Sequence, residues 1–127
     1  MIFFLNGKFV QEEHAMVSVR DHGFLYGDGV YETLRTYHGK VWNVKAHVDR
    51  LFRSAVGIGL DMPWKKKEVG FWIEEAVRRN SKVARALRLL RRRPRTAPRN
   101  DSIVEYRIRV TVSRGANHFD FLTTKHP

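Results

Sequence analysis

Arg50 lies where a guanidinium could hold an anion. It belongs to a stretch in which Val48, Leu51 and Ala55 recur at the spacing of a helix that buries one face. The arginine lies beside this apolar stripe rather than opposite it, so it can reach a buried anion, and its planar fork suits phosphate. The alternative is a surface arginine whose stem covers Leu51 or Phe52.

Two further arginines lie in a strictly alternating segment, residues 104–113. Arg107 and Arg109 fall on its polar side, where together they could hold a substrate carboxylate. A solvated sheet face is the alternative. Residues 30–37 also alternate, with Tyr31 and Arg35 on one side, and this pattern suits a pocket wall as well as a solvated face.

Other chemistries find little support in the sequence. Gly23, Gly27 and Gly29 match neither a P-loop nor the dinucleotide-binding fingerprint, so they indicate a shaped turn. The six histidines form no metal-binding pattern, and no serine lies in a nucleophile elbow. We therefore expect no metal site and no hydrolase triad.

The elements that must position these residues combine strands and helices. Asn6-Gly7 between two apolar runs predicts a hairpin of strands 2–5 and 8–10. The pattern predicts an α+β fold, a meandering antiparallel sheet with two packed helices. The other expected elements are a short strand at 17–19, a strand at 30–37 with its return at 41–44, a helix capped by Asn43 and ended by Gly57 and Gly59, a helix from Pro63 closed by Asn80, and a strand at 104–113.

Composition narrows the class of protein. No cysteine is present, no apolar run is long enough to span a membrane, and the N-terminus lacks a basic leader, so we expect a cytoplasmic protein. The formal charge of +11 is concentrated in an Arg-rich insert at 82–99, which carries eight basic residues and no acidic one. Such a run could bind nucleic acid. It contains no aromatic residue for base stacking, and a solvated loop is the expected alternative.

Three segments resemble landmarks of the class IV aminotransferases. They are VSVRDHGFLYGDGVYETLR at 17–35, HVDRLFRSA at 47–55 and RIRVTVSRG at 107–115. Each is moderately specific, and the three occur in the family's order and spacing. The chain therefore resembles the N-terminal domain of these enzymes, the fold of the D-amino-acid aminotransferase-like (fold type IV) proteins.

The resemblance implies a pyridoxal 5'-phosphate enzyme whose cofactor lies between two domains. The position matched by Arg50 binds the cofactor phosphate. Positions matched by Tyr26, Tyr31 and Arg35 line the substrate pocket, often across a dimer interface, and that of Arg109 helps to hold a substrate carboxylate. The implied partners are an amino acid, a 2-oxo acid and a second subunit.

The sequence of residues 21–29 most resembles that of branched-chain aminotransferases, which transfer the amino group to 2-oxoglutarate. Residues 31–34 also resemble the D-amino-acid aminotransferases and the aminodeoxychorismate lyases.

The resemblance covers residues 1–115, and we expect a frayed tail at 116–127. No lysine of the chain matches the one that binds the cofactor covalently, which the family carries in a second domain. We thus expect a truncated chain without turnover, and association through the apolar surface that the second domain would cover.

Overall fold

The computed structural model describes residues 1–90 and 103–116, with the backbone alone for 88–90. Most of the Arg-rich insert and the tail from residue 117 lie outside the described residues. The elements are β1 (Ile2–Leu5), β2 (Lys8–Gln11), a short 3-10 helix (Glu12–His14), α1 (His22–Tyr26), β3 (Gly29–Tyr37), β4 (Lys40–Val41), α2 (Val44–Gly57), α3 (Lys66–Leu90) and β5 (Arg107–Ser113).

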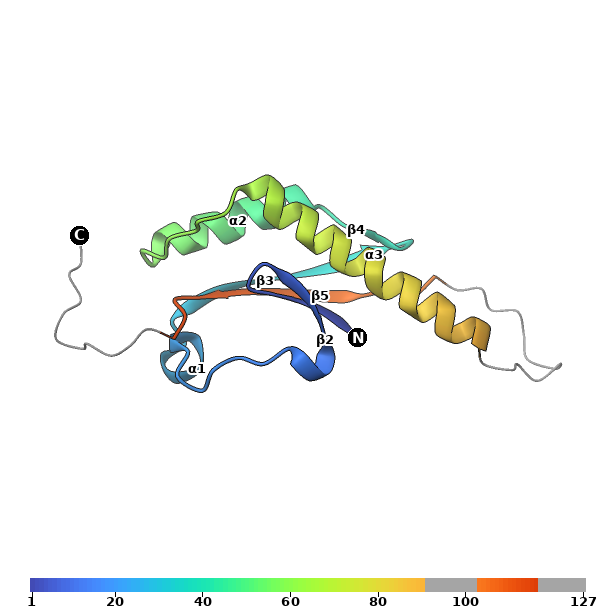
Figure 1. The fold of residues 1–127 in the computed structure, drawn as a ribbon. Coiled ribbons are helices and arrows are strands. Elements are labelled where there is room, and N and C mark those ends of the chain that lie inside the picture. The colour runs from blue at the N-terminus through green and yellow to red at the C-terminus, as the bar shows by residue number, and fades with distance from the viewer. Residues whose placement is uncertain (91–102, 117–127) are drawn as a thin grey trace.

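The central layer is an antiparallel sheet in the order β4-β3-β5. α2 and α3 lie together over one side of it, while α1 lies on the other side (Figure 1). Side chains of β3 alternate strictly between buried and exposed, as expected for a strand with one covered face. The predicted α+β class, with two helices packed on an antiparallel sheet, is confirmed.

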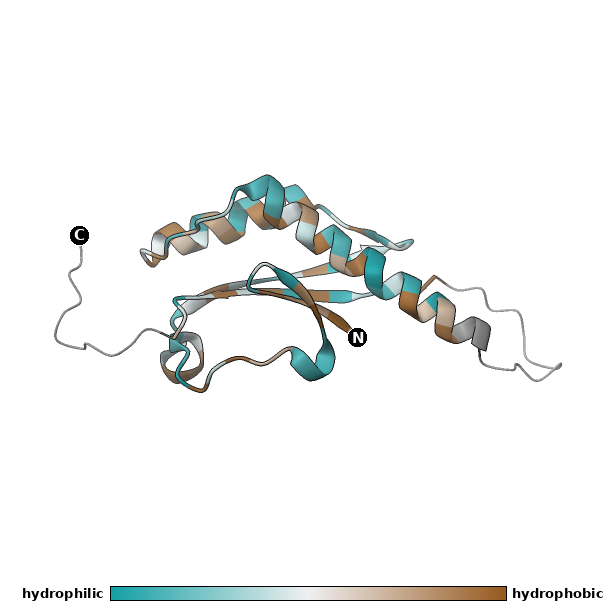
Figure 2. Ribbon diagram, in the orientation of Figure 1, coloured by the Kyte–Doolittle hydropathy of each residue, from teal (hydrophilic) through white to brown (hydrophobic). Residues whose placement is uncertain are grey.

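The core fills the space between the sheet and the two long helices. Leu34 of β3 and Leu51 of α2 are each 1% exposed, and Ala55 is fully buried between them and their neighbours. Apolar and polar residues alternate along both helices, as Figure 2 shows. The helical period predicted for α2 therefore corresponds to its buried stripe.

The N-terminal hairpin is confirmed. Asn6 and Gly7 both adopt positive φ, 47° and 87°, and Leu5 pairs with Lys8 across the two-residue turn. Phe4 stacks on Trp72 of α3 with ring centroids 4.6 Å apart. This contact attaches the hairpin to the helix layer.

Three expectations about boundaries are wrong. Residues 17–19 form no strand, and their two valines are largely exposed. The return strand is only Lys40–Val41, because Asn43 adopts a left-handed conformation and α2 begins at Val44. Asn43 is the residue at the N-cap position, as expected, but its side chain makes no capping hydrogen bond. The last strand begins at Arg107 rather than at residue 104.

The second long helix extends further than predicted. Asn80 does not end α3, which continues to Leu90 through residues of good helix propensity that include no proline or glycine. The side chain of Asn80 accepts from the backbone nitrogen of Ile2 at 2.9 Å and donates to its carbonyl at 2.8 Å. Its role is thus to hold β1 against α3.

No helix among the described residues has the length and apolar character needed to cross a membrane.

We predict that Asn80→Ala destabilises the chain by about 1–3 kcal/mol, because two partly buried backbone groups of Ile2 lose their partner. Urea unfolding followed by tryptophan fluorescence measures this change. Ser54→Ala, at an exposed position of α2, is the control and should change the free energy of unfolding by less than about 0.5 kcal/mol. Equal effects of the two substitutions would contradict the role given to Asn80.

Candidate functional site

A carboxylate, a guanidinium and an imidazole meet between β3 and α2. Glu32 belongs to the face of β3 that the helices cover, and it is 5% exposed. Arg50 of α2 donates to both of its oxygens, from Nε at 2.5 Å and from Nη2 at 2.6 Å. Nδ1 of His47, one helical turn earlier, lies 2.8 Å from the same carboxylate. The two hydrogen bonds fix the plane of the guanidinium.

Charge explains why this carboxylate is tolerated inside the fold. The hydrogen bonds from Arg50 lower the pKa of Glu32 to about 2, against the raising effect of burial, and His47 adds to the lowering. The same contact raises the pKa of Arg50. Glu32 therefore stays ionised, and Arg50 stays charged, over the whole physiological range.

Arg50 remains accessible although one edge of its guanidinium is occupied. Its side chain is 58% exposed, whereas the Glu32 carboxylate beneath it is nearly covered. Among the described residues, its hydrogen bonds involve Nε and Nη2. A phosphate could thus approach a guanidinium whose orientation is already set. These residues fit the phosphate end of pyridoxal phosphate.

The opposite face of the sheet carries the other predicted residues. Tyr31 and Arg35 alternate with the buried residues of β3, and β5 pairs Arg109 with Thr33 on the same face, so all three point away from the helices. The guanidinium carbon of Arg109 lies 3.9 Å from the ring centroid of Tyr31. This distance allows a cation–π contact and places a cation and a phenol side by side on an exposed surface.

The structure does not bring all five predicted residues together. Tyr31, Arg35 and Arg109 share the outer face of the sheet, while Arg50 lies with Glu32 on the helix side. Tyr26 belongs to α1, where its ring contacts His22 edge-on at 5.2 Å between centroids. The described residues therefore present separate surfaces rather than one closed pocket.

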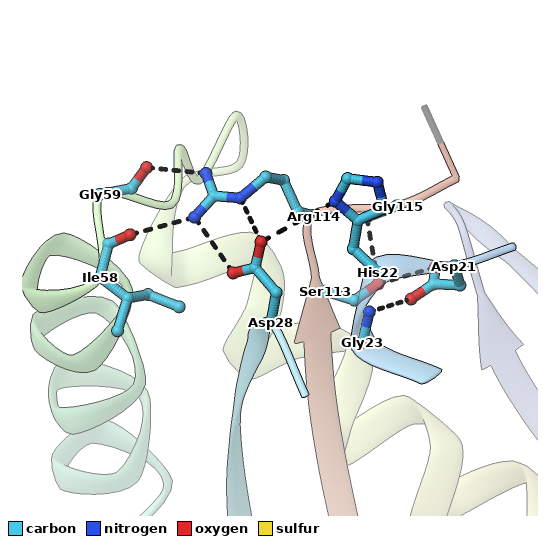
Figure 3. Close-up of polar contacts among 9 residues, drawn as sticks. All are labelled: Asp21, His22, Gly23, Asp28, Ile58, Gly59, Ser113, Arg114 and Gly115. Atoms are coloured by element: carbon cyan, nitrogen blue, oxygen red, sulfur yellow. Dashed lines mark hydrogen bonds and ion pairs between the residues drawn. The ribbon is translucent and has the colours of Figure 1, made fainter. Parts of the chain in front are cut away.

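Residues 21–29 are held by the end of β5 (Figure 3). Arg114 donates to both oxygens of Asp28, at 2.6 and 3.1 Å, and to the carbonyls of Ile58 and Gly59 after α2. The contact with Arg114 lowers the pKa of Asp28. One arginine thus joins the start of β3, the end of β5 and the end of α2.

A second set of bonds holds α1 in place. Asp21 accepts from the backbone nitrogen of Gly23 at 2.8 Å and from the hydroxyl of Ser113 at 2.9 Å, and the nitrogen of His22 donates to the carbonyl of Gly115. Together with the Arg114 contacts, these bonds fix the segment that bears Tyr26.

Sequence reasoning missed Glu32, His47, Asp28 and Arg114 as site residues. A signal existed for Glu32, since strand alternation places it on the same face as Val30 and Leu34, where an acidic residue needs a partner. Among the described residues, no group of three metal-ligating side chains is present.

Comparison with known proteins identifies the family. The model of the amino-transferase class IV family matches residues 29–127. The chain belongs to the class IV aminotransferases. The fold type IV predicted from the three sequence segments is confirmed.

Individual class IV relatives extend this result. A D-alanine aminotransferase of Staphylococcus epidermidis is 41% identical over 99 residues, which cover 78% of this chain and 35% of the relative. A branched-chain aminotransferase from the thermophilic archaeon Thermoproteus uzoniensis, solved with norvaline, is 26% identical with a TM-score of 0.61, over 89% of this chain and 40% of that one.

A hypothetical aminotransferase from Mycobacterium tuberculosis, solved in its pyridoxal-phosphate-bound form, has a TM-score of 0.68 and 28% identity over 91% of this chain and 34% of that one. The family's cofactor is thus pyridoxal phosphate. The chain spans about a third of the length of the relatives that it matches.

We predict that ionised Glu32 stabilises the fold only while its carboxylate is charged. Its folded pKa, about 2, lies below the ordinary value of 4.5, so the unfolded chain binds the extra proton between these values. The contribution is complete above about pH 4.5 and is lost as the pH falls towards 2.

Asp49 and Glu75 also have pKa values of about 2, so they contribute to the pH dependence of wild-type stability in the same range. The test therefore compares wild type with Glu32→Gln, which removes the contribution of Glu32 alone. Chemical unfolding at several pH values should give a difference of about 1–3 kcal/mol at pH 7 that shrinks towards pH 2. A difference that does not vary with pH would refute the assignment.

Proposed function

We propose that the chain is the cofactor-phosphate-binding part of a transaminase that moves an amino group from a branched-chain amino acid to 2-oxoglutarate. The observation that carries this proposal is the exposed guanidinium of Arg50, which Glu32 fixes through two hydrogen bonds. A preoriented fork binds an anion at a lower entropic cost than a mobile side chain. Arg50 would therefore hold the phosphate, while Glu32 and His47 hold Arg50.

The outer face of the sheet would serve substrate recognition. Arg109 carries the positive charge that a substrate carboxylate requires, and its contact with Tyr31 restricts where that charge lies. Arg35 extends the cationic surface, and Tyr26 would approach the same substrate from α1. Because Arg50 lies on the other side of the sheet, a complete pocket would need residues from a second domain or a second subunit.

Pyridoxal phosphate, when bound, supplies an electron sink for the bonds around the substrate's α-carbon. No lysine in this chain matches the family position for covalent attachment, so that lysine would come from a second domain. The contribution of the residues described here is to bind and orient. We propose no turnover for the chain by itself.

A D-amino-acid transaminase is the second candidate for the complete enzyme. It is favoured by the D-alanine aminotransferase of S. epidermidis, which matches 78% of this chain. An aminodeoxychorismate lyase is a further alternative, because residues 31–34 also resemble that branch of the family. Comparison of L-leucine with D-alanine as amine donor, with the chain joined to a lysine-bearing domain, would separate the two transaminases.

We predict that the chain binds pyridoxal 5'-phosphate more tightly than pyridoxal, and that Arg50→Gln removes this difference. Loss of a charge-assisted contact to phosphate should weaken binding by about tenfold or more, whereas pyridoxal binding should not change. Isothermal titration calorimetry with the two ligands measures both effects. Arg50→Lys, which keeps the charge and loses the fork, should fall between wild type and Arg50→Gln.

The matched control is Arg53→Gln, an exposed arginine one turn further along α2. It removes the same charge from the same helix and should leave the preference for the phosphorylated ligand intact. Equal losses in the Arg50 and Arg53 variants would point to general charge attraction and would exclude Arg50 as the phosphate ligand.

We also propose that the face bearing α1 binds a second copy of the chain or a second domain. Its largely exposed apolar side chains include Val19 at 71% and Phe24 at 72%. Exposed apolar residues gathered on neighbouring segments are typical of a protein interface. The other members of this group are Met16, Val17, Leu25 and Tyr26.

The prediction is that the chain self-associates and that Phe24→Ser weakens the association. Sedimentation velocity over a range of concentrations should show the wild type moving to larger species while the variant stays smaller. Val56→Ser is the control, because Val56 is 79% exposed on α2, away from α1. A monodisperse wild-type monomer at high concentration would contradict the proposal.

A further inference from the structure

A second basic surface lies between α3 and the β3–β4 turn. The turn and β4 form one wall of a groove, and residues 74–85 of α3 form the other. The groove is open to solvent and has a volume of about 540 Å³, within the range of small-molecule sites. Its polar lining residues are Lys40, Glu74, Arg78, Ser81, Lys82 and Arg85.

Positive charge predominates in this groove. Among the described lining residues, four cationic side chains stand against the single carboxylate of Glu74. Arg78 is partly neutralised, since it donates from Nε and Nη2 to Glu75, at 2.5 Å each. Lys40, Lys82 and Arg85 make no ion pair with any residue that the structure describes. Three cations thus face the groove without an ion-pair partner in the described part of the chain, and Glu74 offsets one of their charges.

Helix geometry aligns these cations. Arg78, Lys82 and Arg85 occupy positions i, i+4 and i+7 of α3, so they lie on one face of the helix along about 10 Å of its axis. Lys40 approaches from the other wall, which belongs to the sheet layer. An anion in the groove would therefore meet charge from two separate elements.

We propose that this groove binds a small ligand that carries two or more linked phosphate groups. Lys82 and Arg85 lie along one wall and Lys40 lies on the other, so two or more linked phosphates can meet more of these cations than a single phosphate can. The Ser81 hydroxyl adds a neutral donor, and Val41 and Val77 supply an apolar part of the lining. This site is independent of the cofactor role proposed for Arg50.

A nucleic-acid strand fits the groove less well. The described residues that line it include no aromatic side chain, so they offer bases no ring to stack on. The geometry thus favours a compact polyphosphate.

The test is isothermal titration of the chain with inorganic triphosphate at two salt concentrations. We expect saturable binding that orthophosphate does not match, and a loss of about threefold to tenfold in affinity in each of Lys82→Gln and Lys40→Gln. The two substitutions lie on different walls and at exposed positions, so neither should alter the fold, and thermal melting checks this.

The matched control is Lys67→Gln. Lys67 is an exposed lysine of the same helix, about 22 Å along its axis from Lys82, and it does not line the groove. This variant should bind triphosphate as wild type does. Equal weakening by Lys67→Gln and Lys82→Gln, or equal affinity for orthophosphate and triphosphate, would overturn the proposal.

A final arm uses a fluorescent single-stranded oligonucleotide. Oligonucleotide binding that triphosphate cannot displace and that Lys82→Gln weakens would assign the groove to a strand and would also overturn the proposal. Displacement by triphosphate, or no oligonucleotide binding at all, supports it.

Discussion

The ion pair between Glu32 and Arg50 constrains how β3 and α2 are arranged. An unpaired carboxylate at 5% exposure would be costly, so the fold needs a cation that reaches β3 from the helix layer. Apolar contacts tolerate small rotations of a helix, whereas two hydrogen bonds to one carboxylate do not. The position of Arg50 is thus a consequence of the requirement to satisfy Glu32.

Because Glu32 must face the helices, β3 presents different residues on its two faces. Because successive side chains of a strand point to opposite faces, the residue that fixes Arg50 cannot share a surface with its neighbours Tyr31 and Thr33. Register then decides what Tyr31 meets. β5 pairs Thr33 with Arg109, and the long arginine side chain reaches diagonally to the Tyr31 ring. A single strand therefore supports the helix that carries Arg50 on one face and a tyrosine–arginine pair on the other.

Local signals in the sequence predicted those elements whose causes are local. Asn6-Gly7 specified its hairpin because both residues accept positive φ, and the apolar period of α2 specified its buried face. The five-residue helix α1 is too short to show a period, and Asn80 resembled a helix end although its side chain bonds to β1. The family was predicted from three ordered motifs rather than from any of these patterns.

The candidate site, too, could be predicted only where its causes are local. Alternation placed Tyr31 and Arg35 on one face, and a second alternating segment contained Arg109, but their meeting depends on a pairing register that neither segment encodes alone. The partner of Arg50 lies 18 residues away on a different element. Such contacts depend on tertiary geometry, which is why the buried acid was visible in the pattern while its partner was not.

The glycines at 23, 27 and 29 form the shaped turn expected from the sequence, and they serve packing. A Cβ on Gly29 would lie 2.7 Å from the carbonyl oxygen of Val112, and one on Gly23 would lie 2.8 Å from Cβ of Ser113. Gly27 has a φ of 67° at the end of α1, a conformation that favours glycine. These glycines let the segment lie directly against the end of β5, where Arg114 holds it through Asp28. Because the turn is packed against β5, the sheet sets its position. The same packing would set where Tyr26 could contact a substrate.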